Sequence, residues 1–362
     1  MSQNSMFTPL SIRGMTLANR LVMSPMCQYS AVDGMVNDWH LVHLGSRAIG
    51  GTGLVISEMT NISPEGRISP GCAGMYKPGH VQAWKRVVDF VHEHTDAKIA
   101  IQLAHAGRKA SCDVSWKGGS PLPEEHAWKI MAPSPIPFSP ESQVPDQMTE
   151  DDMERLIEAF SQGARWADEA GFDMIEIHGG HGYLISSFIS PLANTRNDSF
   201  GGPLENRMRF PVSVFRGIRA NWPDEKPISM RISAYDWVEG GIEVDDAVQI
   251  GKMMKGEGLD VLDVSSGNVT NDPRPHVEGL FQTPFSERIR KESGILTMTV
   301  GNVGGPKQIN AVIEEGKADL CCMAKGQLFD PYFAHHAAKT LDVENHQWPK
   351  QYAAAGFFKP AE

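Results

Sequence analysis

The sequence predicts an α/β fold, a (β/α)₈ TIM barrel formed as a single domain over residues 1–362. Eight short apolar runs recur along the chain, each with the length of a strand that is buried on both faces. Amphipathic segments of helical period lie between most of these runs, as expected for a parallel sheet. The alternative, a doubly wound sheet, usually carries a G-x-G-x-x-G turn after its first strand, and no such turn follows the first run here.

The eight apolar runs are expected to form the barrel strands in chain order. Several are rich in β-branched residues, which pack well on a pleated surface. The runs are Leu21–Pro25, Leu54–Met59, Ile99–Leu103, Met174–Ile177, Ile228–Ile232, Val261–Val264, Leu296–Val300 and Leu320–Ala324.

Four of the segments between the runs carry helix signals. One of them follows Thr149, whose side chain is expected to cap the helix together with Asp152, three residues further on. Another has a proline in its first turn, where a missing N–H costs nothing. Three end at a glycine, the residue that most often terminates a helix. The segments are Val81–His94, Met153–Glu169, Asp245–Lys255 and Pro306–Glu315, and the last three are expected to end at Gly171, Gly256 and Gly316.

Two stretches break this alternation. Residues 111–148 follow the third strand, are rich in proline and glycine, and are interpreted as a long loop of the kind that often has a function. Residues 341–362 form a C-terminal tail that ends in Phe357 and Phe358. Two adjacent phenylalanines at a chain end need burial, so we expect the tail to contact a neighbouring protomer in a homodimer or homotetramer.

Composition excludes several classes of protein. The net charge is −11, whereas nucleic acids and anionic membranes favour basic partners. No uninterrupted apolar stretch reaches the ~18 residues of a transmembrane helix, and the polar start of the chain does not resemble a secretory signal. The five cysteines include no C-x-x-C pair, which argues against a zinc ribbon or an iron–sulfur cluster. We therefore expect a cytoplasmic protein.

Reactive and hydrogen-bonding side chains lie at or just after most of the predicted strands. In TIM barrels these positions form the active site, because the carboxyl ends of the strands share one rim. The candidates are Pro25, Met26, Cys27 and Tyr29 after the first strand, Met59 at the end of the second, Gln102 in the third, His178, His181 and Tyr183 after the fourth, Arg231 in the fifth, Gly304 after the seventh, and Ala324 and Lys325 after the eighth.

Some of these candidates have more than one interpretation. Gly304 and Gly305 precede a predicted helix, so they form either an ordinary turn or, with Lys325, a cradle for a phosphate group. Arg231 lies in an apolar strand and must be paired, with Asp236 or Glu58, or face a ligand.

The histidines and the cysteine also leave alternatives open. His178 and His181 form a structural pair, a metal site with Glu176 or Asp173, or two donors to a carbonyl oxygen beside the proton donor Tyr183. Cys27, taken without the other residues, also fits a small apolar residue that is simply buried in the core.

Longer motifs carry a resemblance to a known family. They are Asn19–Tyr29, Trp39–His40, Gln102–Lys109, His178–Leu184 and Ser190–Phe210. Over nearly its whole length the sequence resembles the old yellow enzyme family of flavin-dependent ene-reductases, in particular its thermophilic-type bacterial class, class III. The resemblance implies a TIM barrel with FMN bound non-covalently, reduced by NADPH or NADH.

The resemblance also implies roles for the candidate residues. The substrate is an α,β-unsaturated carbonyl compound whose Cβ receives a hydride from flavin N5 and whose Cα receives a proton from Tyr183. His178 and His181 correspond to the pair that binds the carbonyl group, Cys27 to a residue that tunes the flavin, and Tyr29 to a hydroxyl on the substrate side. The residues that line the flavin ring in the family correspond to Pro25, Met26, Met59, Gln102 and Arg231. Those that bind its phosphate correspond to Gly304, Ala324 and Lys325.

The sequence departs from the family pattern at several points. Met59 stands where alanine or threonine is usual, Lys325 replaces an arginine, and the tail contains no arginine. The runs Tyr235–Gly241 and Gln282–Phe285 are similar to the reductase part of aryl-CoA monooxygenase/reductase fusions, which makes an aryl-CoA or dienoyl-CoA substrate the alternative. The alternative from another class, a metal-dependent barrel lyase or hydrolase, leaves Cys27, Gln102 and the phosphate site unexplained.

Overall fold

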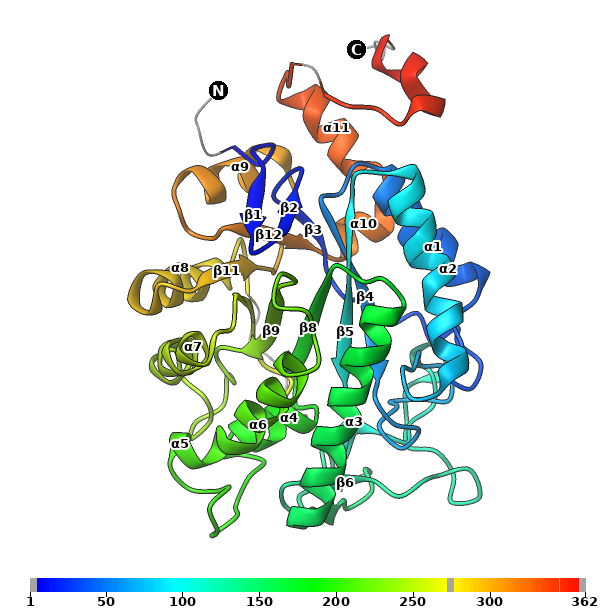
Figure 1. Cartoon of the computed structure of the whole chain (residues 1–362). Coiled ribbons are helices and arrows are strands. Elements are labelled where there is room, and N and C mark those ends of the chain that lie inside the picture. The colour runs from blue at the N-terminus through cyan, green and yellow to red at the C-terminus, as the bar shows by residue number, and fades with distance from the viewer. Residues whose placement is uncertain (1–4, 272–276, 345, 358–362) are drawn as a thin grey trace.

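Eight parallel strands close into a barrel in the computed structural model, which describes residues 5–271, 277–344 and 346–357 (Figure 1). Every predicted run contributes a strand, so the TIM barrel is confirmed and the doubly wound alternative is wrong. Pairing of the last strand with the first closes the sheet. The strands are β3 (Leu21–Met23), β4 (Leu54–Asn61), β5 (Lys98–Ala104), β8 (Met174–Gly179), β9 (Ile228–Ser233), β10 (Val261–Ser265), β11 (Leu296–Thr299) and β12 (Leu320–Met323).

A hairpin that the sequence pattern did not predict precedes the barrel. Strands β1 (Leu10–Ile12) and β2 (Met15–Leu17) pair antiparallel, and each is too short to show a clear alternation of apolar and polar residues. Leu17 packs with residues inside the barrel, among them Val22 and Met174. The hairpin therefore closes the barrel at the amino-terminal ends of the strands.

Helices surround the barrel, and the predicted ones are present. Two of them, α2 (Pro78–His94) and α3 (Glu150–Glu169), begin three residues earlier than predicted, and one predicted end is wrong: α7 (Val244–Glu257) continues through Gly256 and ends before Gly258, whose φ of +100° takes the chain out of the helix. Glycine adopts this left-handed conformation without steric cost. The helices are α1 (Asp38–Ile49), α2 (Pro78–His94), α3 (Glu150–Glu169), α4 (Leu184–Ile189), α5 (Leu204–Arg207), α6 (Arg209–Arg219), α7 (Val244–Glu257), α8 (Thr283–Ser293), α9 (Pro306–Glu314), α10 (Lys325–Phe329) and α11 (Phe333–Thr340).

The predicted cap of α3 is confirmed. The hydroxyl of Thr149 accepts a hydrogen bond from the backbone N–H of Asp152 at 3.1 Å, and the Asp152 carboxylate accepts one from the Thr149 N–H at 3.0 Å. Thr149→Ala is expected to lower the free energy of unfolding by about 1 kcal/mol, because one end of the reciprocal cap is lost. Urea denaturation measures the change, with Val144→Ala at a 63 % exposed position as control. Equal midpoints for wild type and Thr149→Ala would contradict the role of the cap.

The long loop after β5 lies at the carboxyl-terminal end of the barrel, opposite to the β1–β2 hairpin and α11 (Figure 1). It contains a short 3₁₀ turn at Ser115–Lys117 and two strands, β6 (Met131–Ala132) and β7 (Asp146–Gln147), which pair with each other. Residues 111–148, which the sequence analysis interprets as a long loop, thus contain only these short elements of regular structure.

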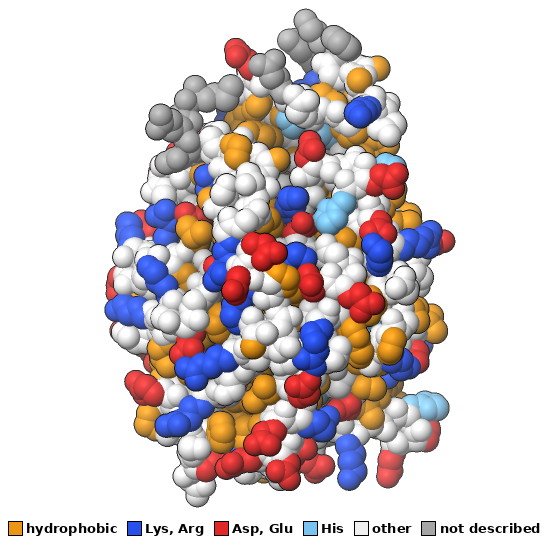
Figure 2. Space-filling view, in the orientation of Figure 1, with side chains coloured by type: hydrophobic (Ala, Val, Ile, Leu, Met, Phe, Trp, Pro, Cys, Tyr) orange, Lys and Arg blue, Asp and Glu red, His pale blue; other side chains and the backbone are white. Residues whose placement is uncertain are grey.

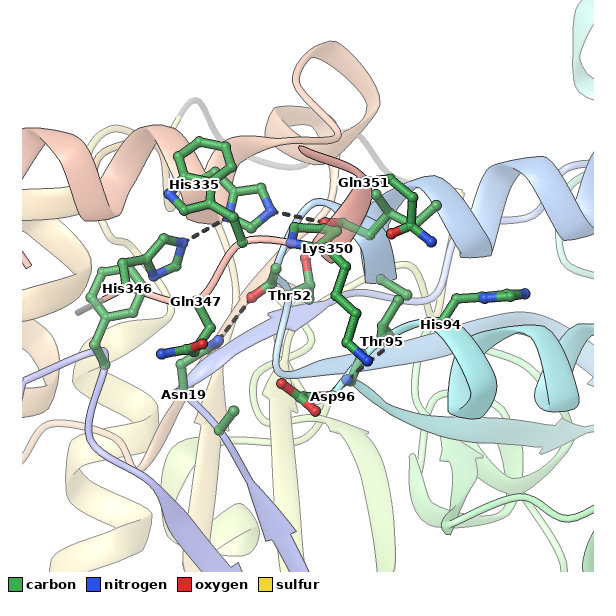
Figure 3. A pocket seen from close by; sticks show the side chains of 18 of the residues that line it. Asn19, Thr52, His94, Thr95, Asp96, His335, His346, Gln347, Lys350 and Gln351 are labelled. Carbon is green, nitrogen blue, oxygen red and sulfur yellow. Dashed lines mark hydrogen bonds between the residues drawn. The ribbon is translucent and has the colours of Figure 1, made fainter. Parts of the chain in front are cut away.

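The C-terminal tail lies over the amino-terminal end of the barrel. Trp348 stacks on His335 of α11 with 4.3 Å between ring centroids. Tail and barrel together enclose a cleft of about 700 Å³ (Figure 3), whose wall includes Asn19 and Thr52, just before β3 and β4. The cleft is therefore at the opposite end from the candidate active site. Phe358 and the side chain of Phe357, on which the oligomer prediction depends, lie outside the described residues.

The surface carries charges of both signs. Acidic and basic side chains are interspersed over the face shown in Figure 2. Within the part of the chain that the structure describes, the helices are too short or too polar to cross a lipid bilayer.

Candidate active site

The loop after β8 brings three of the predicted residues together. The ring of His178 is 5.2 Å from that of His181 and 5.0 Å from that of Tyr183, between centroids. Gly182 makes this approach feasible: its φ is +72°, and a Cβ there would lie 2.4 Å from the backbone oxygen of Asn268. Any other residue would push the loop away from its neighbour.

Neighbouring groups orient the side chains of both histidines. His178 is buried, and its Nδ1 accepts a hydrogen bond from the N–H of Gly180 at 3.4 Å. Burial, with the positive charge of Arg231, lowers the pKa of His178, so the ring is neutral and its proton lies on Nε2. The Nε2 of His181 lies 2.7 Å from the hydroxyl of Ser265. The loop therefore presents two imidazoles, of which that of His178 is neutral.

Lys109 fixes this loop, a role that sequence reasoning missed. Its ammonium group donates hydrogen bonds to the backbone oxygens of His181 at 2.9 Å and Asn268 at 3.2 Å. It also lies 4.9 Å from the centroid of the Tyr183 ring. Lys109 thus links the loops after β5, β8 and β10. Its place just after the third strand, in the motif Gln102–Lys109, was the available signal, but its partners are distant in the sequence.

Cys27, Tyr29, Met59 and Tyr183 meet in one apolar cluster. Desolvation raises the pKa of the Cys27 thiol and that of the Tyr183 phenol. Both groups therefore keep their protons at neutral pH. The half-buried Met26 packs nearby against the main core.

Arg231 has a partner that the sequence did not predict. Its Nε lies 2.9 Å from the Asp263 carboxylate, and its Nη2 donates to the Ser24 hydroxyl at 2.8 Å. The proposed partners Asp236 and Glu58 are wrong. Asp263 stands directly beside Arg231 in the β9–β10 register, whereas Asp236 lies beyond the end of β9.

Gln102 belongs to a second hydrogen-bonded group inside the barrel, with Glu176 and Ser229. Its side-chain N–H₂ donates to Glu176 at 2.9 Å, and the other oxygen of Glu176 accepts from Ser229 at 3.1 Å. Asp173 pairs with His92 on the outside of the barrel. Among the described residues, no three His, Cys, Asp or Glu side chains converge as they would to hold a metal ion.

The predicted phosphate site lies where two neighbouring helices begin. Gly305 precedes α9, and Ala324 precedes α10, whose first residue is the exposed Lys325. A Cβ built on Gly304 would meet nothing closer than 3.8 Å, and one on Gly305 nothing within 4 Å. Open space at Gly304 and Gly305 and a cation at the start of α10 are therefore both present, and both suit an anionic group.

Comparison with known proteins distinguishes between the functions that the sequence analysis left open. A family model described as "NADH:flavin oxidoreductase / NADH oxidase family" matches residues 5–344. The chain belongs to this family. The resemblance to old yellow enzymes is thereby confirmed, and the protein is an oxidoreductase that uses FMN together with NADH or NADPH.

Curated members of the family are similar over nearly the whole chain. An NADPH dehydrogenase of Geobacillus sp. is 44 % identical over 94 % of this chain and 95 % of its own. An NADPH dehydrogenase of Listeria innocua is 41 % identical over 97 % and 99 %. Among solved structures, morphinone reductase covers 100 % of this chain and 95 % of its own at 24 % identity, with a TM-score of 0.79. This last likeness shows the fold alone.

The residues at the carboxyl-terminal ends of the strands suit the binding of FMN. A planar, polar ring system needs hydrogen-bonding groups inside the barrel, which Gln102 and Arg231 offer, and its phosphate needs the open helix ends near Lys325. Both sets lie at the carboxyl-terminal ends of the strands, where TIM barrels bind their ligands.

Proposed function

We propose that this protein is an ene-reductase that reduces the C=C bond of α,β-unsaturated carbonyl compounds, with NADPH or NADH as the reductant. The observation that carries the proposal is the convergence of two imidazoles and a protonated phenol on one loop. The curated relatives named NADPH dehydrogenase support NADPH as the reductant.

His178 and His181 bind the substrate carbonyl. The Nε2–H group of His178 donates a hydrogen bond to the carbonyl oxygen, because Nδ1 already accepts one from the Gly180 N–H. Hydrogen bonds to this oxygen draw electron density from the alkene and stabilise the negative charge that develops in the transition state. FMN supplies the hydride that Cβ of the substrate accepts. Tyr183 then donates its proton to Cα, and Tyr29 contacts the substrate beside it.

The cofactor is held at two places. Pro25, Met26, Met59 and Gln102 would line the flavin ring, and the guanidinium of Arg231 would stabilise negative charge on it. Gly304, Ala324 and Lys325 bind the phosphate. Lysine provides a point charge there rather than the two parallel hydrogen bonds of an arginine.

A direct test is an anaerobic assay. The purified holoenzyme is expected to bleach when NADPH is added and to regain its colour when 2-cyclohexenone is added, with cyclohexanone as the product by gas chromatography. Bleaching without formation of the saturated ketone would contradict ene-reductase activity.

Cys27→Ala is expected to shift the flavin reduction potential and to weaken substrate binding without unfolding the protein. The thiol lies in the cluster of Tyr29, Met59 and Tyr183, so it would contact both the cofactor and the substrate when these are bound. Spectroelectrochemical titration measures the potential, with the buried Cys321→Ala, on the outer side of β12, as the control. A titration curve superimposable on that of wild type would remove Cys27 from this role.

An aryl-CoA or dienoyl-CoA ester is the second candidate substrate, favoured by one observation. Tyr235, Trp237 and Phe285 form an aromatic cluster at the carboxyl ends of β9 and β10, with centroid distances of 4.8 to 5.9 Å. The indole N–H of Trp237 donates to Ser266 at 3.0 Å, next to the Ser265 that contacts His181. Such a surface suits a large planar acyl group.

We propose in addition that the chain forms a homodimer or homotetramer in the cytoplasm. Phe329 of α10 is 93 % exposed, an unusual position for a phenylalanine in a monomer. Light scattering of the holoenzyme tests this, and a monomeric mass would contradict it.

A further inference from the structure

Two carboxyl groups inside the barrel have no part in the mechanism above. Glu176 on β8 and Asp263 on β10 are both 0 % exposed. They lie on either side of β9: Asp263 is beside Arg231 in the register, and Glu176 is beside Ser229, two residues before Arg231. A single buried cation therefore faces two buried acids.

The charges balance only if one acid keeps a proton. Two carboxylates and one guanidinium would leave a net negative charge in a dry interior, which costs far more free energy than retaining a proton. Neighbouring carboxyl groups in such a site do not both ionise. The set is neutral when it holds one carboxylate, one carboxylic acid and one guanidinium.

The contacts indicate which acid keeps the proton. Asp263 lies 2.9 Å from the Nε of Arg231, so its ionised form is compensated directly. Glu176 has no cation as a direct partner: it contacts the amide of Gln102 and the hydroxyl of Ser229, and it shares a hydrogen bond with the Asp263 carboxyl group. Burial, followed by the nearby charge of Asp263, raises the pKa of Glu176 to about 8.

We propose that Glu176 is a positioning residue that remains protonated at neutral pH, so that Arg231 faces the flavin with one compensating carboxylate instead of two. The inference rests on the proposed placement of Arg231 and Gln102 beside the flavin ring. When Glu176 loses its proton, a second negative charge appears behind Arg231. The guanidinium then stabilises a reduced, negatively charged flavin less well, and the reduction potential falls.

The other groups around Glu176 do not titrate in this range. His178, on the same strand, is neutral because burial lowers its pKa, and the Cys322 thiol on β12 keeps its proton because burial raises its pKa. Arg231 and Asp263 are paired with each other. The remaining neighbours, Gln102 and Ser229, carry no charge at any relevant pH.

Potentiometric titration of the holoenzyme across the range from about pH 6 to about pH 9 tests the inference. Glu176→Gln is the informative variant, because glutamine fixes the uncharged form and keeps an oxygen for Gln102. We expect equal potentials at the acid end. Above about pH 8 the wild-type potential should fall more steeply than that of the variant. Glu93→Gln, on the surface of α2, is the control and should follow wild type.

A second measurement needs neither the flavin nor a variant that folds. The infrared spectrum of wild-type protein should contain the C=O band of a protonated carboxylic acid at neutral pH, and the band should disappear as the pH rises through about 8. Absence of this band, or identical potential curves for wild type and Glu176→Gln, would overturn the inference. Failure of the enone assay alone would overturn the proposed function and leave the protonation of Glu176 as measured.

Discussion

Tyr183→Phe is expected to slow oxidation of the reduced enzyme by 2-cyclohexenone about 10²–10⁴-fold, the contribution of a positioned general acid. After hydride transfer the substrate is an enolate-like species bound by His178 and His181, and it needs a proton at Cα. Burial raises the pKa of Tyr183, so its phenol is protonated at every pH at which the enzyme is assayed. Phenylalanine keeps the ring in the apolar cluster and removes only this proton.

Stopped-flow measurement of the two half-reactions separates this role from a structural one. Reduction by NADPH involves no proton from Tyr183 and should proceed at close to the wild-type rate. Tyr352→Phe, a 40 % exposed tyrosine of the tail, is the matched control and should leave both rates unchanged. Equal slowing of both half-reactions by Tyr183→Phe, or unchanged oxidation, would remove this residue from the role of proton donor.

The barrel could be predicted from sequence because each strand is buried on both faces and therefore appears as a short, mostly apolar run. The position of the site followed, because residues after successive parallel strands must share one rim. The β1–β2 hairpin was missed because strands of three residues carry too little pattern. The end of α7 was missed because Gly256 and Gly258 are equally good stop signals, and only the backbone conformation distinguishes them.

The contacts between distant segments could not be predicted in the same way. Asp263 stands in an apolar run, V-L-D-V, and a buried acid there signals that some cation must be near. Which cation it meets depends on the register between β9 and β10, which no local pattern records. Lys109 contacts Asn268 for a similar reason, since their proximity results from closure of the barrel.

Arg231→Leu is expected to lower the free energy of unfolding at neutral pH by about 3–5 kcal/mol, the usual cost of leaving a buried charge without its partner. Asp263 is 0 % exposed and lies 2.9 Å from the guanidinium that the substitution removes. Glu176, on β8 at the other side of β9, already holds a proton and supplies no positive charge to compensate Asp263. The cost is carried by Asp263, which must either stay charged in an apolar interior or take up a proton.

The loss of stability caused by Arg231→Leu should increase as the pH rises. Without Arg231, burial raises the pKa of Asp263 in the folded state above its unfolded value of about 3.9. A raised folded-state pKa means that the folded protein binds more protons than the unfolded chain, so stability decreases as the pH rises. Urea denaturation of wild type and Arg231→Leu should therefore differ less at about pH 5 than at about pH 8. Arg288→Leu removes an exposed guanidinium that pairs with Asp245 on the surface, and it should change stability little at either pH. A loss of equal size at both pH values would mean that Arg231 contributes packing rather than charge compensation.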